Sequence, residues 1–269
     1  MTWNTKRTLL ALFLIITLMI ACFGLGVLPI NLFLFKDNIA ESARDHLGVD
    51  VEIGGPLILR LGFNPTLSAR EIRLGLSGPR EQPLAQVSTL KVKSRMGSIL
   101  KGEIDLRSLT ANGISLAQGS FGDAGALLKN LDLKVTAPLG SPLTADVSGV
   151  LGKNEVSLEV TGADIGTLLD DPESYPLEAQ YTTPFSRLRM DGAASRPLSR
   201  ASLQARIDFE TASLAEELAV FGMDAPGLSD ATLSSALFLD GEELRVENGR
   251  GDLNGTCLLY TSDAADDLA

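Results

Sequence analysis

The chain contains few of the residue types from which catalytic, metal-binding or disulfide-linked sites are usually built. Its 269 residues include one histidine, His46, and two cysteines, Cys22 and Cys257, and aromatic residues make up only 5%. One imidazole cannot form a histidine-rich site, and two cysteines do not make a disulfide framework. H-E-x-x-H, G-x-S-x-G, P-loop and C-x-x-C motifs are also missing. We therefore expect a protein that is not an enzyme and holds no cofactor or metal ion.

Positive charge is scarce too. The chain has 23 basic and 34 acidic residues, which give a net charge of −11. Binding to nucleic acid needs clustered lysines and arginines opposite the phosphates, so we expect no nucleic-acid partner. Asp170, Asp171 and Glu173 form a short acidic cluster, but a Ca²⁺-binding loop needs a longer series of ligands. We interpret this cluster as part of a solvated loop.

Charge is absent altogether from one long segment near the N-terminus. No charged residue lies between Arg7 and Lys36. The run from Leu9 to Leu28 (LLALFLIITLMIACFGLGVL) is long enough for a helix to cross ~30 Å of hydrocarbon. Basic residues precede this run and acidic residues do not, which predicts a cytoplasmic N-terminus. We expect residues 1–35 to be a cytoplasmic stub and a single-pass membrane anchor.

Two other interpretations of the apolar run are weaker. A cleaved signal peptide would have an apolar region of ~7–15 residues and a small-residue cleavage site, whereas this run is longer and has no A-x-A site. The residues before Cys22 (MIA) resemble a lipobox, but apolar residues follow Cys22 where a lipoprotein would have a polar tether. An uncleaved anchor fits the sequence better than either alternative.

The chain after the anchor begins with a predicted amphipathic helix. Residues 36–47 (KDNIAESARDHL) place Ile39, Ala43 and Leu47 on one face, and Gly48 stands where a helix would end. All 34 acidic residues and 21 of the 23 basic residues lie from Lys36 onward, so this part carries a net charge of −13. The exported part is therefore acidic.

From about residue 49 the apolar residues alternate with polar ones, which is typical of strands with one apolar and one solvated face. Short strands separated by Gly, Pro, Asn or Ser predict a mainly β, antiparallel architecture. The alternating apolar positions include Leu57, Leu59 and Leu61; Ile72, Leu74 and Leu76; Leu131, Leu133 and Val135; Val156, Leu158 and Val160; and Leu203, Ala205, Ile207 and Phe209.

Turns and short helices interrupt this pattern. Leu237 and Leu239 are expected to face Leu244 and Val246 across a two-residue turn at Asp240-Gly241. Segments 124–130, 165–171 and 213–221 are expected to hold one or two helical turns, the last with a capping box from Ser213 to Glu216. Residues 170–176 (DDPESYP) predict a loop and a candidate subdomain boundary.

The order of these features resembles the N-terminal region of the AsmA family of bacterial envelope proteins. A membrane helix and a short amphipathic helix precede residues 46–78 (HLGVDVEIGGPLILRLGFNPTLSAREIRLGLSG), which are similar to the family's opening block. Residues 97–116 (GSILKGEIDLRSLTANGISL) are similar to its recurring unit, in which a short helix or loop ends at Leu100 and a strand begins at Ile104 and Leu106. Residues 130–162 and 190–255 resemble later blocks.

The resemblance implies a protein anchored in the bacterial inner membrane with its bulk, residues 36–256, in the periplasm. It also implies a role in outer-membrane biogenesis and a curved or groove-like sheet whose apolar face binds the acyl chains of membrane lipids. Candidate lining residues are Leu57, Leu59, Leu61, Leu74, Leu131, Leu133 and Val135. The sequence leaves open a second interpretation, in which the same face is a core packed against another sheet or against helices.

Two further functions stay open alongside lipid transport. The protein could be an assembly factor that binds other envelope proteins by adding a strand at an open sheet edge. A membrane-anchored hydrolase is the weakest alternative, because no nucleophile and base stand at a recognisable spacing.

The last residues differ in composition from the rest. Residues 257–269 (CLLYTSDAADDLA) do not continue the alternating pattern, and they resemble translated sequencing-adapter sequence. Proteins of the AsmA family are also typically longer. We therefore expect the native sequence to depart from this one near Thr256, with an ordinary unstructured C-terminus as the alternative.

Overall fold

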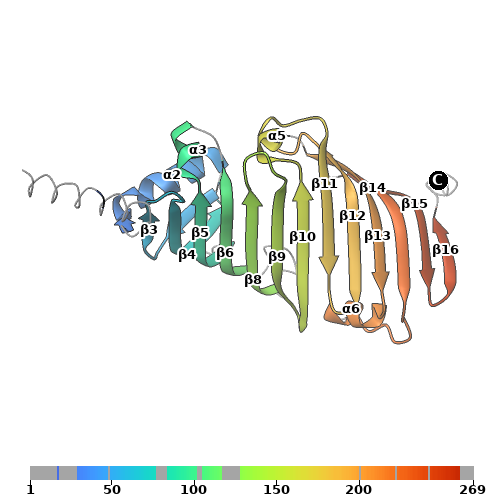
Figure 1. Ribbon diagram of the computed structural model, residues 1–269. Helices are drawn as coiled ribbons and strands as arrows, with labels where there is room; N and C mark the ends of the chain where they lie inside the picture. Colours follow the sequence, from blue (N-terminus) through green and yellow to red (C-terminus); the bar gives the residue numbers. More distant parts are fainter. Residues whose placement is uncertain are drawn as a thin grey trace, which may run out of the picture. The chain divides into compact units, whose positions relative to one another are not determined.

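The fold is known from a computed structural model (Figure 1), which describes residue 17 and residues 29–47, 49–76, 84–101, 105–116, 128–199, 201–221, 223–241 and 243–260. The expected membrane anchor, Leu9 to Leu28, lies outside these residues except for Thr17. Within the described residues, no helix has both the length and the apolar character needed to span a membrane. The described chain is mainly β with a few short helices, as the alternating pattern predicts.

Fifteen described strands pair antiparallel to their neighbours. In hydrogen-bonding order they are β1, β3, β4, β5, β6, β8 and then β9 to β16 in sequence, with β2 paired to β4. The chain divides into two compact units between Thr110 and Ala111, which lie within β6 (Leu106–Leu116). Unit 1 precedes this point and unit 2 follows it, so the predicted loop at residues 170–176 lies inside unit 2.

The elements of unit 1 before β6 are β1 (Pro29–Asn31), η1 (Phe33–Phe35), α2 (Lys36–Leu47), β2 (Val49–Ile53), β3 (Leu57–Arg60), β4 (Thr66–Leu76), β5 (Ala85–Ser94) and α3 (Met96–Lys101). Those of unit 2 after β6 are β8 (Leu128–Ala137), β9 (Leu143–Leu151), β10 (Asn154–Gly162), α5 (Ile165–Leu169), β11 (Tyr175–Thr182), β12 (Ser186–Ser195), β13 (Ser202–Thr211), α6 (Leu214–Val220), β14 (Ala231–Asp240), β15 (Glu243–Leu253) and β16 (Thr256–Tyr260).

In unit 1, β2 and β3 pair with successive halves of β4, because a break at residues 54–56 (GGP) divides what would otherwise be one strand. Lys36, the first residue of α2, stabilises this break. Its Nζ donates hydrogen bonds to the carbonyl oxygens of Ile53, at 3.0 Å, and Gly55, at 2.6 Å. Leu57, which directly follows the break, and Ile72 of β4, which pairs with Ile53 before it, are buried in the core of unit 1.

The predicted short helices are largely confirmed. Helix α2 spans residues 36–47 as expected, and α5 and α6 occupy the segments expected after residues 165 and 213. Ser213 caps α6, where its hydroxyl accepts a hydrogen bond from the backbone N–H of Glu216 at 3.4 Å. The helix expected over residues 124–130 is wrong for residues 128–130, which form the start of β8, and residues 124–127 lie outside the described residues.

The predicted hairpin is confirmed in its pairing. Leu239 pairs with Leu244 and Leu237 with Val246, so strands β14 and β15 have the expected register. Asp240 pairs with Glu243, which places the turn one residue later than the sequence pattern suggests. Gly241 has a φ of 61° in this turn, a left-handed conformation that glycine adopts without steric cost.

The region around Thr256 is also ordered as a strand. Strand β16 begins at Thr256 and pairs with β15 through Tyr260, so the β structure runs past the expected change at residue 257. Residues 261–269 lie outside the described part of the chain.

Candidate functional site

Unit 2 contains an antiparallel sheet with two chemically different faces. The strand registers place one row of large apolar side chains across seven neighbouring strands, β8 to β14. We call this the central row, and the face that carries it the apolar face. The central row is Leu133, Val147, Leu158, Tyr181, Leu188, Phe209 and Leu233.

A second apolar row follows on the same face, two residues further along each strand. It consists of Val135, Ala145, Val160, Ala179, Met190 and Ile207, and it ends at Ser235 in β14. Side chains two residues apart on a strand point to the same face of the sheet. The two rows therefore lie side by side and form a continuous apolar surface. Most of these side chains are aliphatic.

The apolar face is only partly covered by the rest of the described chain. The central-row residues are half-buried, except that Leu233 is 39% exposed. Further along the sheet, Leu244 of β15 is 61% exposed and Leu258 of β16 is 54% exposed. All the described strands belong to one sheet, so in this part of the chain no second sheet packs on the face as in a sandwich.

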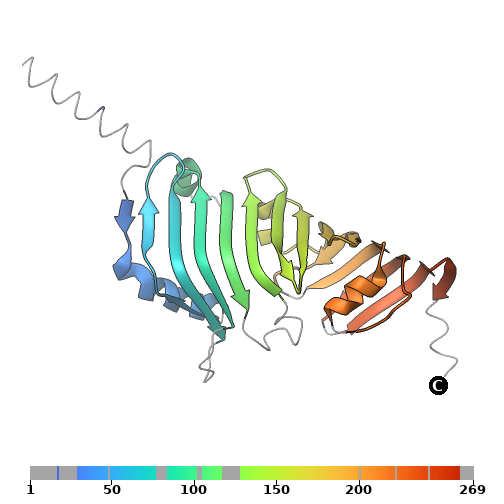
Figure 2. The ribbon, with the colours of Figure 1, turned by 90° about the horizontal axis from the view of Figure 1, so that it is seen from below.

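Helix α6 lies at one end of the strands of unit 2 (Figure 2). Glu217 of α6 accepts a hydrogen bond from the hydroxyl of Thr183, in the turn between β11 and β12. Val220 of α6 lies close to Gly152, in the turn between β9 and β10. Burial raises the pKa of the Tyr181 phenol, and the negative charge of Glu217 adds to this rise. Because Tyr181 belongs to the central row, α6 lies on the apolar side of the sheet.

Helix α5 follows β10 and stands at the opposite end of the strands (Figure 1). Asp164 caps it by accepting hydrogen bonds from the N–H groups of Gly166 and Thr167. The hydroxyl of Thr167 donates to the same carboxylate, and this is the main reason why the pKa of Asp164 is lowered. Tyr175, on the apolar side, donates its hydroxyl proton to the carbonyl of Ala163 at 2.8 Å. The two helices thus border the apolar surface at its two ends.

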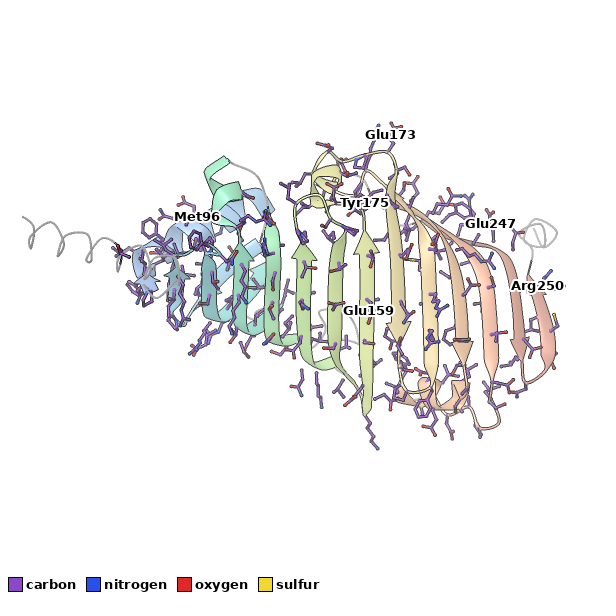
Figure 3. All side chains as sticks on the ribbon, in the orientation of Figure 1. Met96, Glu159, Glu173, Tyr175, Glu247 and Arg250 are labelled. Carbon is purple, nitrogen blue, oxygen red and sulfur yellow. The ribbon has the colours of Figure 1, made fainter. Side chains whose placement is uncertain are left out.

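The opposite face, which we call the polar face, carries charged side chains such as Glu159 (Figure 3). Ion pairs connect several of them. Arg187 and Glu210 face each other on β12 and β13 at 3.4 Å, and Arg245 of β15 lies 2.8 Å from Glu243. These exposed pairs contribute little to stability, but they keep this face solvated.

The seven lining residues expected from the sequence divide between the two units. Leu131, Leu133 and Val135 lie on β8 in unit 2 and are half-buried on the apolar face. The other four are in unit 1. Leu57 is 1% exposed and is a core residue, whereas Leu59, Leu61 and Leu74 are half-buried.

The sequence reasoning missed several members of the apolar face. Leu177, Ala179 and Tyr181 alternate along β11, and Leu188 and Met190 alternate along β12. The same period of two that identified β10 would have found them. The alternating stretches in β11 and β12 are short and stand between prolines and charged residues, so they are weak signals for a strand. Which face their side chains join depends on the pairing with neighbouring strands, which is known only from the fold.

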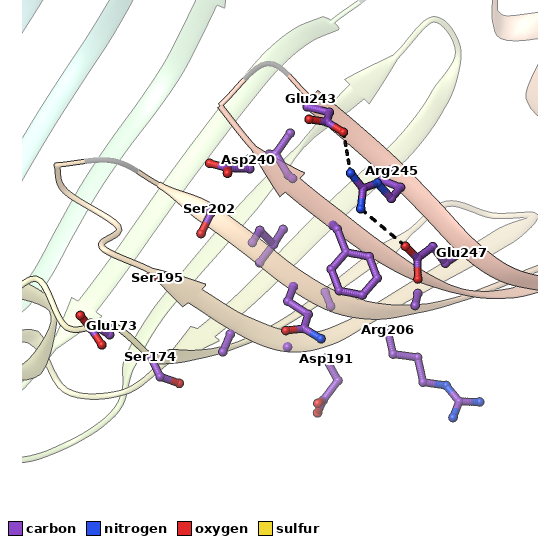
Figure 4. Close-up of a pocket in the computed structure, with 18 residues that line it drawn as sticks. Glu173, Ser174, Asp191, Ser195, Ser202, Arg206, Asp240, Glu243, Arg245 and Glu247 are labelled. Carbon is purple, nitrogen blue, oxygen red and sulfur yellow. Dashed lines mark hydrogen bonds and ion pairs between the residues drawn. The ribbon is translucent and has the colours of Figure 1, made fainter. Parts of the chain in front are cut away.

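Two hollows of unit 2 open on the polar face. The larger has a volume of about 980 Å³ and is formed by strands β12 to β15 together with Glu173 and Ser174 (Figure 4). The smaller, about 420 Å³, lies further along the same strands and is lined by Arg187, Arg189 and Arg250 together with acidic residues. Both hollows lie on the opposite side of the sheet from the apolar face.

The chain was also compared with known proteins. No family model, no curated protein and no solved structure matches it significantly.

Proposed function

We propose that this chain is a non-enzymatic protein anchored in the bacterial inner membrane, which transports or organises phospholipids for outer-membrane biogenesis. The acyl chains would lie on the apolar face of unit 2. The resemblance of residues 46–78 to the AsmA family motivates the location and the biological process. The observation that carries the lipid-binding proposal is the partly exposed apolar surface, whose central row crosses seven strands.

The dimensions of the face support this assignment. Neighbouring strands are ~4.8 Å apart, so a row crossing seven strands extends over roughly 29 Å. One leaflet of a bilayer core is ~15 Å thick, which is the depth that a lipid's acyl chains fill. An acyl chain lying across three or four strands would therefore be in contact with apolar side chains over its whole length, and each buried CH₂ contributes about 0.8 kcal/mol.

A second candidate function is the binding of envelope proteins by strand addition. One observation favours it: among the described strands, β1 pairs with β3 on one side and with no strand on the other. An edge of this kind can pair with a strand of another protein. Crosslinks to a protein partner from β1, with no lipid retained on the chain, would favour this alternative.

The proposal predicts that the full chain retains phospholipid through purification. We expect solvent extraction and mass spectrometry of the detergent-washed protein to recover phospholipid in at least equimolar amount. The matched control is residues 1–35 fused to an unrelated soluble domain, which would carry only lipid bound around the anchor. Equal lipid in the two preparations would refute lipid binding by the exported part.

A further inference from the structure

The larger hollow on the polar face has a regular construction. Strand registers arrange twelve of its lining residues in three rows that each cross β12, β13, β14 and β15. The first row is Ser195, Ser202, Asp240 and Glu243; the second is Ala193, Gln204, Phe238 and Arg245; the third is Asp191, Arg206, Ala236 and Glu247.

Differences in side-chain size create the hollow. Ala193 and Ala236 are short, and the serines of the first row are little longer, so they leave space above the sheet. Gln204, Phe238 and Arg245 stand side by side in the middle row and form a larger ledge next to that space. A volume of about 980 Å³ is near the upper end of the ~300–1,000 Å³ that is typical of ligand sites.

Phe238 is an apolar residue on the otherwise polar face. It is the only aromatic residue that lines the hollow, and its direct neighbours across the strands are Gln204 and Arg245. An aromatic ring has a negative face that attracts weakly positive C–H groups, and it offers a rigid apolar surface. A phenylalanine among polar side chains therefore suits a ligand that has both an apolar side and many polar groups.

The polar groups around Phe238 offer both donors and acceptors. Gln204 can donate and accept at once, Arg245 donates, and the carboxylates accept. The guanidinium of Arg206 is instead paired with Asp208, at 3.3 Å, and Ser234, at 3.2 Å. Arg245 is held in place between Glu243, at 2.8 Å, and Glu247, at 3.9 Å (Figure 4). Each hydroxyl group of a sugar can both donate and accept a hydrogen bond. Neighbouring sugar hydroxyl groups therefore match this mixture of donors and acceptors around Phe238.

The charged side chains that line the hollow restrict the class of ligand further. Among the described residues, five carboxylates and two guanidinium groups line the hollow, an excess of three negative charges. Phosphorylated, sulfated or uronic-acid ligands would be repelled by this lining. A ligand cation above Phe238 would meet Arg245, which is the ring's direct neighbour on β15. An uncharged ligand avoids both conflicts.

We propose that this hollow is a binding site for an uncharged oligosaccharide. One pyranose ring would stack on Phe238, and its hydroxyl groups would bond to Gln204, Arg245 and the flanking carboxylates. The volume accommodates a short oligosaccharide in preference to a single sugar. The site lies on the opposite side of the sheet from the apolar face, so it is independent of the proposed lipid function.

Titration calorimetry on the full chain tests this, in a detergent whose headgroup is not a sugar. The probes are cellotriose and tri-N-acetylchitotriose, with trigalacturonate and spermidine as charged counterparts. We expect at least one neutral trisaccharide to bind with a Kd of about 1 mM or tighter. No binding of either neutral probe at about 10 mM would overturn the proposal, as would tighter binding of spermidine or trigalacturonate.

Two variants locate the binding in the hollow. Phe238→Leu keeps an apolar side chain but removes the ring, and we expect it to weaken binding about tenfold or more. Gln204→Met removes the amide and keeps the length of the side chain, and it should also weaken binding. Phe221→Leu, at an exposed phenylalanine after α6, is the matched control and should bind like the unmodified chain. Unchanged affinity in both Phe238→Leu and Gln204→Met would overturn the assignment.

Discussion

Leu158→Asp should remove most of the phospholipid that the full chain retains. Leu158 lies in the middle of the central row, between Val147 on β9 and Tyr181 on β11. A carboxylate there would be covered by a bound acyl chain, and removing such a charge from water costs several kcal/mol. Since about 1.4 kcal/mol corresponds to a tenfold change in affinity, retained lipid should fall by about tenfold or more. Mass spectrometry of extracted lipid measures this.

The neighbouring residue supplies a matched control. Ser157 precedes Leu158 on β10 and faces the polar side, opposite Ser148 and Thr182. Ser157→Asp therefore introduces the same charge into the same strand, and we expect it to leave the lipid content unchanged. Leu158→Ala keeps the face apolar and should retain most of the lipid. This variant controls for the loss of the leucine side chain and for any folding defect that this loss causes. Equal losses in Ser157→Asp and Leu158→Asp would contradict the proposed role of the apolar face.

Gly192→Ala should destabilise unit 2 by about 3 kcal/mol, because overpacking costs 1–3 kcal/mol and more where backbone must move. A Cβ at Gly192 would lie 2.6 Å from the Cα of Ala205 on β13 and would also press on the carbonyl oxygen of Gln204. Strands β12 and β13 could not keep their present distance. At about 2–4 °C per kcal/mol, Tm should fall by roughly 6–12 °C, measured by scanning calorimetry.

Gly75 is the control for this substitution. It also lies in a strand, β4, but the nearest atom to a Cβ there is the Cβ of Asp50, at 3.9 Å. Gly75→Ala should be neutral, or stabilising by about 0.4–1 kcal/mol through reduced freedom of the unfolded chain. A loss below about 1 kcal/mol in Gly192→Ala would mean that β12 and β13 do not pair as described.

The pairing of β14 with β15 and the position of β10 could be predicted from the sequence because their signals are local. Val156, Leu158 and Val160 alternate without interruption, and a glycine next to Asp240 marks a two-residue turn. The start of β8 could not be predicted in this way. Leu128 pairs with Leu151, more than twenty residues away, and this pairing overrides a local pattern that favours a helix. Asn130, at a φ of 52°, lies where the register of β8 shifts.

The polar hollow could not be predicted for a related reason. Phe238 lies at a position of β14 that faces away from Leu237 and Leu239, and in the sequence it reads as one more apolar residue in a run. Its place becomes visible only when two strand registers put it beside Gln204 and Arg245. Sequence alternation therefore predicts which face is apolar, whereas the small and large residues that shape a hollow come from separate strands.

The most direct test of the proposed lipid-binding face is a photo-crosslinking scan along β10. A photoreactive amino acid is placed in turn at each position from 155 to 160 in the full chain, in its native membrane. Positions 156, 158 and 160 face the apolar side, and 155, 157 and 159 face the polar side. We predict phospholipid adducts at the three even positions only. Adducts of equal yield at odd and even positions, or none at the even ones, would contradict the assignment of the apolar face as a lipid-binding surface.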